Sequence, residues 1–552
     1  MRALLNSEMP PLYGGTAPMR VILICRAFVG TYLNVSLSLF VMDGKGALER
    51  IAHGTVLAFA GIFISKIFGY VYRLVAARFG AADYGLLSLG LALFNVLMIV
   101  ALLGLNQGAL RYVSFYRGKG DSARVKGTIV SSLLFSGLFS VVVAVALFFL
   151  SDWIALVFFG EPRLGLVFKI LAFVIPFDVL RNVLFNVIRG FENVTYEIYA
   201  RNIAENVVKV LVTVVLFLLG LKLLGATVAF SVAIVVSFVM AAYYGLRFLK
   251  APVRAVAENR ELLLYSVPLV LNNLAILVML WTDTLMIGYF RTAAEVGVYN
   301  AAGPTASLTY LVPQALLSLF LPVLTGLYAL KKMDDFKAAY RSVLKWVMVA
   351  NVALASVFLL VPGKVLTMFF GAEYAAGAAV LVVLSLGYFV YYLALVANNI
   401  LLIYERTRVI FVASALGCVV NVGMNVVLIP KYGIVGAALA TGLAYVAVSV
   451  VFFVVGYKLT GVRVFGKDFL KVLVGGLVSS GVGYGVLLSA PRMPVLVEVA
   501  LVSVVFVLVY LVMLLVLRVV EEPDLVLLRE LERRAGVRLR IVRRVLRRFV
   551  SR

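Results

Sequence analysis

Apolar stretches long enough to cross a bilayer recur along almost the whole chain, and short polar connections separate them. A transmembrane helix needs about 20 mostly apolar residues, and this rule predicts fourteen spans. They cover residues 53–78, 85–106, 127–150, 164–188, 203–220, 223–248, 262–290, 298–326, 343–361, 376–403, 408–429, 432–457, 468–490 and 494–519. The pattern therefore predicts an all-α polytopic membrane protein with about fourteen transmembrane helices.

The composition supports a membrane protein and excludes several other classes. The 552 residues are 64% hydrophobic and 14% charged, whereas a soluble protein carries about 25% charged residues. Cys25, Cys418 and the single His53 are too few for a disulfide framework or a Cys/His metal cluster. No stretch has the composition of a sizeable soluble domain.

Basic residues alternate between the connections and predict the topology. The formal net charge is +24, and Lys and Arg collect on the cytoplasmic side of membranes. The connections after spans two, six, eight and twelve are rich in them, whereas each connection after spans five, seven, nine, eleven and thirteen has one. We therefore predict a multi-pass protein of the cytoplasmic (cell) membrane with both termini in the cytoplasm.

An internal repeat divides the chain. Similar residues recur at a nearly constant offset: Asp83 and Glu295 (295−83 = 212), Gly85 and Gly297 (212), Glu192 and Glu405 (213), and Gly225 and Gly436 (211). The shift equals six spans, an even number, so the copies have the same orientation and are parallel repeats. We predict a first repeat, or N-lobe (43–250), a second repeat, or C-lobe (251–460), and two further helices (461–522).

The two ends differ from the rest. Residues 1–42 look like a non-native or disordered extension, with Met42 as the working start, and the alternative is a real extra N-terminal helix. In the tail (523–552), apolar and Arg residues occupy opposite faces of a predicted helix. Such a basic amphipathic helix is expected on the cytoplasmic leaflet, bound to anionic headgroups, as a topology anchor or in regulation.

The chemistry expected of an enzyme is missing from the sequence. No Gly-Lys pair has the spacing of a nucleotide-binding loop. A membrane glycosyltransferase is expected to carry an acidic pair for a metal in an external loop, and none is found. We therefore predict a transporter rather than an enzyme, with no cofactor or metal apart from a coupling H⁺ or Na⁺.

Two cations in the first span are the leading substrate-binding candidates. Lys66 and Arg73 are seven residues apart, so they lie on the same side of a helix. A cation inside a membrane costs a few kcal/mol or more unless it faces protein or water. We expect both to line a water-filled cavity that accepts an anionic group; the alternative is a structural ion pair with Asp283.

Polar residues of the seventh span complete the candidate set. Asp283 corresponds to Val71 in the repeat (283−212 = 71) and is a candidate charge partner or ion-coupling residue. Asn272 and Asn273 lie nearer the middle of that span, where we expect them to bind substrate.

Five charged residues lie in the fourth and fifth spans. Asp178 and Arg181 belong to the fourth, with Lys169 nearer its outer end. Glu205 and Lys209 begin the fifth, one helical turn apart, and this spacing favours a local ion pair between them.

Several motifs resemble a known family. They are residues 77–88 (ARFGAADYGLLS), 103–114 (LGLNQGALRYVS), 117–121 (RGKGD), 283–290 (DTLMIGYF), 296–299 (VGVY) and 425–438 (NVVLIPKYGIVGAA). Over about residues 50–460 the chain resembles the polysaccharide biosynthesis exporters. These are the oligosaccharide flippases of the multidrug/oligosaccharidyl-lipid/polysaccharide (MOP) superfamily.

The resemblance implies a V-shaped, two-lobed flippase that works by alternating access. Its substrate would be an oligosaccharide linked to polyprenyl or dolichyl (pyro)phosphate, moved across the membrane for surface polysaccharide or glycoprotein synthesis. Lys66 and Arg73 fit the cavity cations, and Asp283 a partner or ion site. Glycosyltransferases or a polymerase of the same pathway are the implied protein partners, and nucleic acid is not expected.

Three other functions remain open from the sequence. A lipid II flippase also has fourteen spans. A cation-coupled drug exporter of the same superfamily is expected to have about twelve spans, and Lys66 and Arg73 have the wrong sign for cationic drugs. A membrane glycosyltransferase lacks its acidic pair here.

Overall fold

The computed structural model describes residues 46–249, 253–256, 258–489, 493–521 and 524. These residues form helices and no β-strand, which confirms the predicted all-α class. Residues 1–42 and, apart from Asp524, the tail 523–552 lie outside the described residues, so the interpretations of both stay predictions. The chain divides into two compact units, residues 1–63 and 64–552, and the sites below lie in the second.

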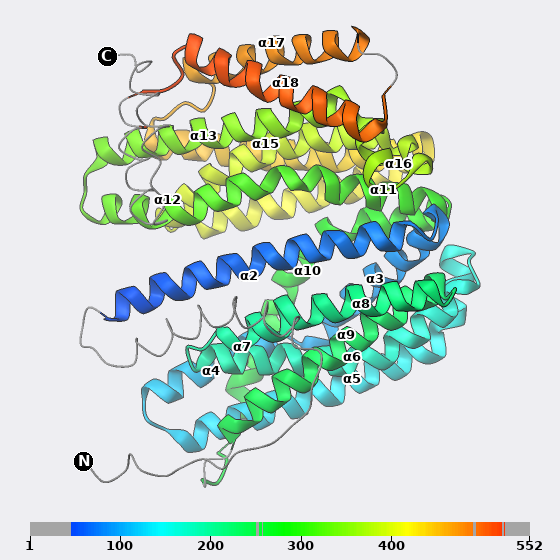
Figure 1. Cartoon of the computed structure of the whole chain (residues 1–552). Helices are drawn as coiled ribbons and strands as arrows, with labels where there is room; N and C mark the ends of the chain where they lie inside the picture. Colours follow the sequence, from blue (N-terminus) through cyan, green and yellow to red (C-terminus); the bar gives the residue numbers. More distant parts are fainter. Residues whose placement is uncertain (1–45, 250–252, 257, 490–492, 522–523, 525–552) are drawn as a thin grey trace, which may run out of the picture. The chain divides into compact units, whose positions relative to one another are not determined.

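The first repeat is built from long helices joined by short turns (Figure 1). In chain order these are α2 (Gly46–Ala77), α3 (Ala81–Leu102), α4 (Leu105–Gly118), α5 (Ser122–Phe159), α6 (Arg163–Gly190), α7 (Thr195–Glu197), the π-helix η1 (Ile198–Ala204), α8 (Glu205–Leu218), α9 (Lys222–Gly245) and the 3₁₀-helix η2 (Leu246–Leu249).

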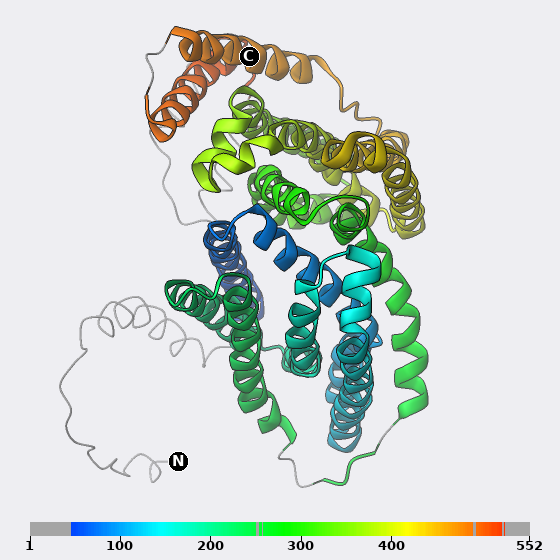
Figure 2. The ribbon, with the colours of Figure 1, turned by 90° about the vertical axis from the view of Figure 1, so that its right-hand side faces the viewer.

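The second repeat and the two further helices follow. They are α10 (Asn259–Phe290), α11 (Ala293–Ala306), η3 (Ser307–Tyr310), α12 (Leu311–Ala329), α13 (Met333–Leu360), α14 (Pro362–Phe369), η4 (Ala372–Gly377), α15 (Ala378–Ile403), α16 (Thr407–Thr460), α17 (Lys467–Ser489) and α18 (Val495–Val516). Helices α17 and α18 pack against each other and against α13 (Figure 2).

Within the described residues, nine helices are long and apolar enough to cross a membrane. The protein is thus a multi-pass membrane protein, and the count of fourteen spans stays a prediction. Predicted spans eleven and twelve lie together in α16, which is interrupted at Gly433, where φ is 58°.

Arg291 stabilises the interruption of α16. A break in a membrane helix leaves backbone carbonyls that need new hydrogen-bond partners. The Arg291 guanidinium donates to the carbonyl oxygen of Ile429, at 3.1 Å from Nη2, and to that of Pro430, at 2.8 Å. The kink therefore has its own side-chain support.

Repeat-related residues meet where α3 contacts α11. A Cβ on Gly85 would lie 1.7 Å from the Ala293 carbonyl oxygen, and a Cβ on Gly297 would lie 2.0 Å from the Ala81 carbonyl oxygen. Both contacts relate positions 212 apart (293−81 and 297−85). Each helix thus offers two small residues four positions apart, a spacing that lets membrane helices approach closely.

Turns also recur between the repeats. Glu192 and Glu405 both have a positive φ, 63° and 57°. Each follows a helix, and the next amide bonds back to a carbonyl five residues earlier, Asn193 to Ile188 and Arg406 to Leu401. Such left-handed helix ends are normally glycine, so two glutamates at the related position support the repeat alignment.

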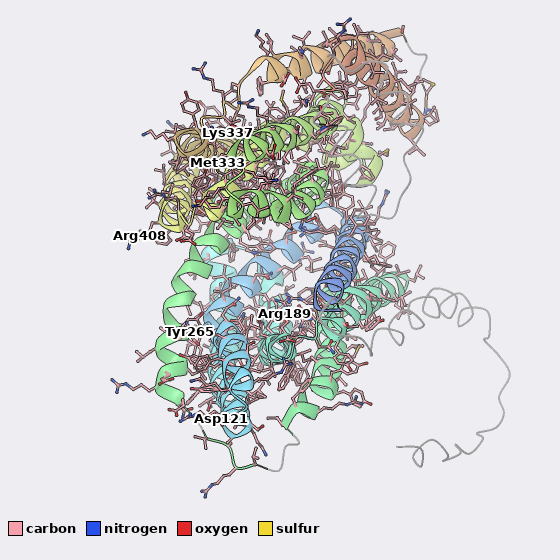
Figure 3. The ribbon with its side chains drawn as sticks, turned by 90° about the vertical axis from the view of Figure 1, so that its left-hand side faces the viewer. Asp121, Arg189, Tyr265, Met333, Lys337 and Arg408 are labelled. Carbon is pink, nitrogen blue, oxygen red and sulfur yellow. The ribbon has the colours of Figure 1, made fainter. Side chains whose placement is uncertain are left out.

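Two of the basic connections lie at the same end of the helices. Those between α4 and α5 and between α12 and α13 are both on the left of Figure 1. Figure 3 views the chain from that side, with Asp121 of the first connection and Met333, the first residue of α13, labelled. The predicted topology also places these two connections on one side of the membrane. Which side faces the cytoplasm stays a prediction.

Candidate functional site

The first candidate site is a buried carboxylate in the second repeat. Asp283 on α10 is 6% exposed. Its Oδ1 accepts hydrogen bonds from Nδ2 of Asn421 at 3.1 Å and of Asn425 at 2.7 Å. Its Oδ2 accepts from the hydroxyl of Tyr299, at 2.5 Å, and from that of Thr441. Helix α11 supplies Tyr299, and the two parts of the interrupted α16 supply the other three donors.

All four donors to Asp283 are neutral. No Lys or Arg among the described residues forms an ion pair with Asp283, so the ion pair with Lys66 or Arg73 considered above is not formed. The Oδ1 of Asn425, itself fully buried, has no hydrogen-bond partner. A buried charge is costly unless it is compensated. With Asp283 as a carboxylate, this group of residues has one negative charge without a positive partner, and the Asn425 Oδ1 is available beside it.

The two cations of the first span are placed differently from each other. Lys66 is exposed and has no ion-pair partner within the described part of the chain. Arg73 is half-buried, and its Nη1 donates to the hydroxyl of Tyr84 at 3.4 Å. That hydroxyl in turn donates to the carbonyl oxygen of Asn300 at 3.2 Å, so Arg73 lies close to where α3 and α11 meet.

The two asparagines predicted to bind substrate are only partly placed. Asn272 and Asn273 lie in α10, but their side chains are outside the described part of the structure. Their role stays a prediction.

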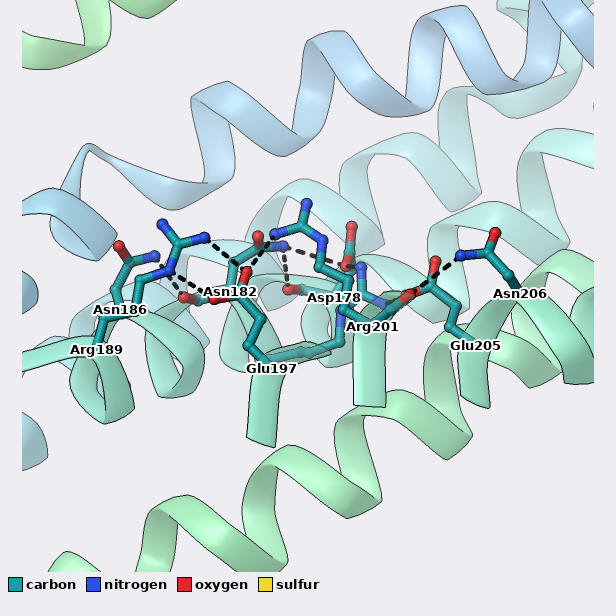
Figure 4. A network of polar contacts seen from close by, with 9 residues as sticks. Asp178, Asn182, Asn186, Arg189, Glu197, Arg201, Glu205 and Asn206 are labelled. Carbon is teal, nitrogen blue, oxygen red and sulfur yellow. Dashed lines mark hydrogen bonds and ion pairs between the residues drawn. The ribbon is translucent and has the colours of Figure 1, made fainter. Parts of the chain in front are cut away.

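A second group of charges is buried in the first repeat (Figure 4). The Arg181 guanidinium on α6 forms ion pairs with Asp178 on its own helix and with Glu205 on α8. The predicted local pair between Glu205 and Lys209 is therefore wrong. The reason is tertiary, because the planar guanidinium reaches two carboxylates at once, whereas the Lys209 ammonium lies 5.3 Å from the ring centre of Tyr72.

The same network extends along α6. The guanidinium of Arg189 binds both carboxylate oxygens of Glu197, at 2.5 and 2.8 Å, and Arg201 lies 3.5 Å from the same carboxylate. Asn182 donates to Asp178, at 3.2 Å between the side chains. Every charge named here has a partner of opposite sign, which is typical of a structural network.

Sequence reasoning found Asp283 but missed its partners. Asn421, Asn425 and Thr441 are polar residues within predicted spans eleven and twelve, and the two asparagines are one helical turn apart. Polar side chains inside membrane spans usually face the bundle interior, and that signal was available. What the sequence lacked was any indication that they face Asp283, which is 138 to 158 positions away.

Comparison with known proteins defines the class. Residues 51–325 match the family described as polysaccharide biosynthesis protein, and residues 268–427 match the MatE family. An uncharacterised membrane protein of Methanocaldococcus jannaschii is 22% identical over 417 residues, 72% of this chain and 82% of its own length. The probable flippase AglR of Haloferax volcanii is 30% identical over 185 residues, 32% of this chain and 37% of its own length.

Solved structures share the fold. The lipid II flippase MurJ in an inward closed conformation aligns with a TM-score of 0.67 at 15% identity, covering 83% of this chain and 97% of that one. An inward-facing multidrug resistance MATE family transporter aligns with a TM-score of 0.61 at 15% identity, covering 72% and 94%. These similarities show the fold. The two family matches together cover residues 51–427, and they confirm the predicted resemblance to the polysaccharide biosynthesis proteins of the MOP superfamily.

Proposed function

We propose that this protein is a flippase that moves a lipid-linked oligosaccharide across the cytoplasmic membrane by alternating access. Its relatives include AglR and a second probable flippase of Haloferax volcanii, which is named for low-salt glycan biosynthesis. The MurJ and MATE similarities, at 15% identity, support the fold and do not select the substrate.

The main support for the proposal is that some cations of the protein have carboxylate partners, whereas Lys66 and Arg73 have none among the described residues. Arg181 and Lys345 are buried, and each is paired with two carboxylates. Lys66, in contrast, is exposed without an anionic partner among the described residues, and the described partner of Arg73 is a tyrosine hydroxyl. Cations at membrane depth face water or an anion rather than hydrocarbon, so Lys66 and Arg73 have charge to offer a ligand.

A phosphate-linked saccharide has the chemistry that these cations suit. Its sugar hydroxyls and phosphate charges cannot enter hydrocarbon without losing their hydration. Lys66 and Arg73 would replace the water around the phosphate, and an arginine binds phosphate oxygens in a bidentate manner. Asn272 and Asn273 would offer amides to the sugar. We propose polyprenyl or dolichyl (pyro)phosphate as the carrier, and glycosyltransferases or a polymerase as pathway partners.

The carboxylate in the second repeat suits a coupling ion. Asp283, Asn421, Asn425 and Thr441 bring together oxygen ligands that hard cations prefer. A half-turn of either amide presents Oδ1 in place of Nδ2. We propose that these residues hold a proton or Na⁺, which would supply the positive charge that the buried carboxylate lacks.

Transport in liposomes tests the function. The purified protein is reconstituted with a fluorescent lipid-linked oligosaccharide, and exposure of the substrate to a membrane-impermeant quencher is followed. Lys66→Ala and Arg73→Ala are each expected to slow transport about tenfold or more, because a lost hydrogen bond to a charged group costs about 1.5–3 kcal/mol. Lys222→Ala, at an exposed cation that begins α9, is the matched control and is expected to leave the rate unchanged.

Two outcomes would contradict the proposal. Equal rates for all variants would mean that Lys66 and Arg73 do not contact substrate. Transport of lipid II but of no lipid-linked oligosaccharide would assign the other substrate class.

A further inference from the structure

The repeat alignment places Lys209 of the first repeat at the position of Asn421 in the second. Asn421 is one of the four donors to Asp283, which together with Asp283 are called the Asp283 site below. Leu216 and Leu428 support the register: a Cβ on Gly225 would lie 2.9 Å from the Leu216 Cβ, and a Cβ on the repeat-related Gly436 would lie 2.1 Å from the Leu428 carbonyl oxygen. The offset of this helix pair is therefore 212 (428−216). At that offset Lys209 on α8 corresponds to Asn421 on α16 (421−212 = 209).

The neighbours of Lys209 also correspond to members of that site. Phe230 on α9 corresponds to Thr441 at the offset of the glycine pair (441−211 = 230), and Tyr72 is adjacent to Val71, the counterpart of Asp283. The Lys209 ammonium lies 5.3 Å from the ring centre of Tyr72 and 5.9 Å from that of Phe230. Helices α2, α8 and α9 of the first repeat thus meet around a cation, as α10 and the two parts of α16 meet around an anion.

The group of charges around Lys209 and the Asp283 site differ in net charge. Lys209 is 9% exposed, and the charged groups that interact with it are Glu205 on its own helix, Arg181 on α6 and Arg73 on α2. Without the half-buried Arg73, and with Asp178, which pairs with Arg181, the remaining two carboxylates, one guanidinium and one ammonium sum to zero. The Asp283 site sums to minus one.

We propose that Lys209 is a built-in cation, covalently tethered at the place in the first repeat that corresponds to the exchangeable cation of the second. The inference rests on the proposed cation coupling at Asp283. A tethered ammonium cannot leave or be replaced by Na⁺, and together with Arg181 it balances the charges of Asp178 and Glu205. Lys209 is thus a positioning residue, and the chain takes up a single coupling cation, or proton, per cycle through Asp283.

Thermal unfolding of the full-length protein in detergent tests this inference. A ligand that binds the folded state raises Tm as its concentration rises. Tm is measured against NaCl, with choline chloride keeping ionic strength constant. Wild type is expected to gain Tm with each tenfold rise in Na⁺, and Asp283→Asn is expected to lose this dependence.

Adding Lys209→Asn to Asp283→Asn is the decisive variant. It places asparagine, the residue found at the related position of the second repeat, and removes one of the two positive charges that balance Asp178 and Glu205, so a dependence of Tm on Na⁺ is expected to return. The matched control adds Lys209→Arg, which keeps the charge and is expected to stay insensitive.

The possible results separate the role of Lys209 from the coupling at Asp283. If Asp283→Asn is insensitive and adding Lys209→Asn restores nothing, the built-in cation is refuted while the coupling at Asp283 stands. If Asp283→Asn keeps the full dependence, coupling at Asp283 is refuted. The single Lys209→Asn variant then decides the role of the lysine, since an added dependence supports it and none refutes it.

A folding failure is also informative. Should Lys209→Asn not fold, Glu205→Gln combined with Lys209→Met removes both charges together. Folding of that double variant would support charge compensation as the role of Lys209, whereas its failure would refute it.

Discussion

The contact between α3 and α11 yields the sharpest prediction about stability. Gly85 and Gly297 are repeat-related, and each lies against the backbone of the opposite helix. Alanine at either position adds a Cβ that points at a carbonyl oxygen, Ala293 O at 1.7 Å or Ala81 O at 2.0 Å. A backbone oxygen within a helix cannot rotate away as a side chain can, so the helices themselves must separate.

The magnitude follows from these distances. Ordinary van der Waals contact begins at 3.4 Å, so Gly85→Ala requires a shift of 1.7 Å along that direction (3.4−1.7). Overpacking costs about 1–3 kcal/mol, and a backbone contact belongs at the upper end. With an unfolding entropy of about 2 cal/mol/K per residue, ~3 kcal/mol lowers Tm by about 2–3 °C for a chain of this length.

Scanning fluorimetry of the purified protein measures this shift. Gly85→Ala and Gly297→Ala are expected to lower Tm by similar amounts. The control is Gly303→Ala, on the same helix α11, where the added Cβ has its nearest neighbour at 3.9 Å and Tm is expected to change little. The double variant is expected to lose less than the sum, because separation by the first alanine makes room for the second.

Two results would refute the reasoning. Full additivity of the two alanines would mean that they disturb separate contacts. A loss at Gly303→Ala equal to that at Gly85→Ala would attribute the effect to helix chemistry rather than to close approach.

Two further predictions concern buried ion pairs. Arg181→Met removes the ion-pair partner of both Asp178 and Glu205, and removing one partner of a buried pair costs about 3–5 kcal/mol. Tm is therefore expected to fall clearly more than for Arg163→Gln, whose exposed pair is worth about 0–1 kcal/mol. Equal shifts would count against a structural network. Lys345 lies 2.5 Å from the buried carboxylate of Asp524, so Lys345→Met is expected to destabilise the attachment of the chain end to α13. Limited proteolysis should then release the C-terminal segment sooner than in Lys471→Met, and unchanged cleavage would contradict this role.

The fold class was accessible from the sequence because it depends on local properties. A run of about 20 apolar residues specifies a membrane helix wherever it lies, and the repeat needs only matching residues at a constant offset. Gly85 and Gly297 carried that signal, and the structure shows that they also face each other. Lys66 and Arg73 were recognised for the same reason, since a cation inside an apolar stretch is visible in one dimension.

The partners of the buried charges were decided by the tertiary structure. Helical periodicity places Glu205 and Lys209 on one face, yet Arg181 of another helix binds Glu205, and two aromatic rings face Lys209. Likewise, the sequence showed Asp283 as a charge within a span, while its donors come from positions up to 158 residues away. The physical reason is that the helical period fixes which residues share a face, whereas the packing of all the helices fixes which faces meet.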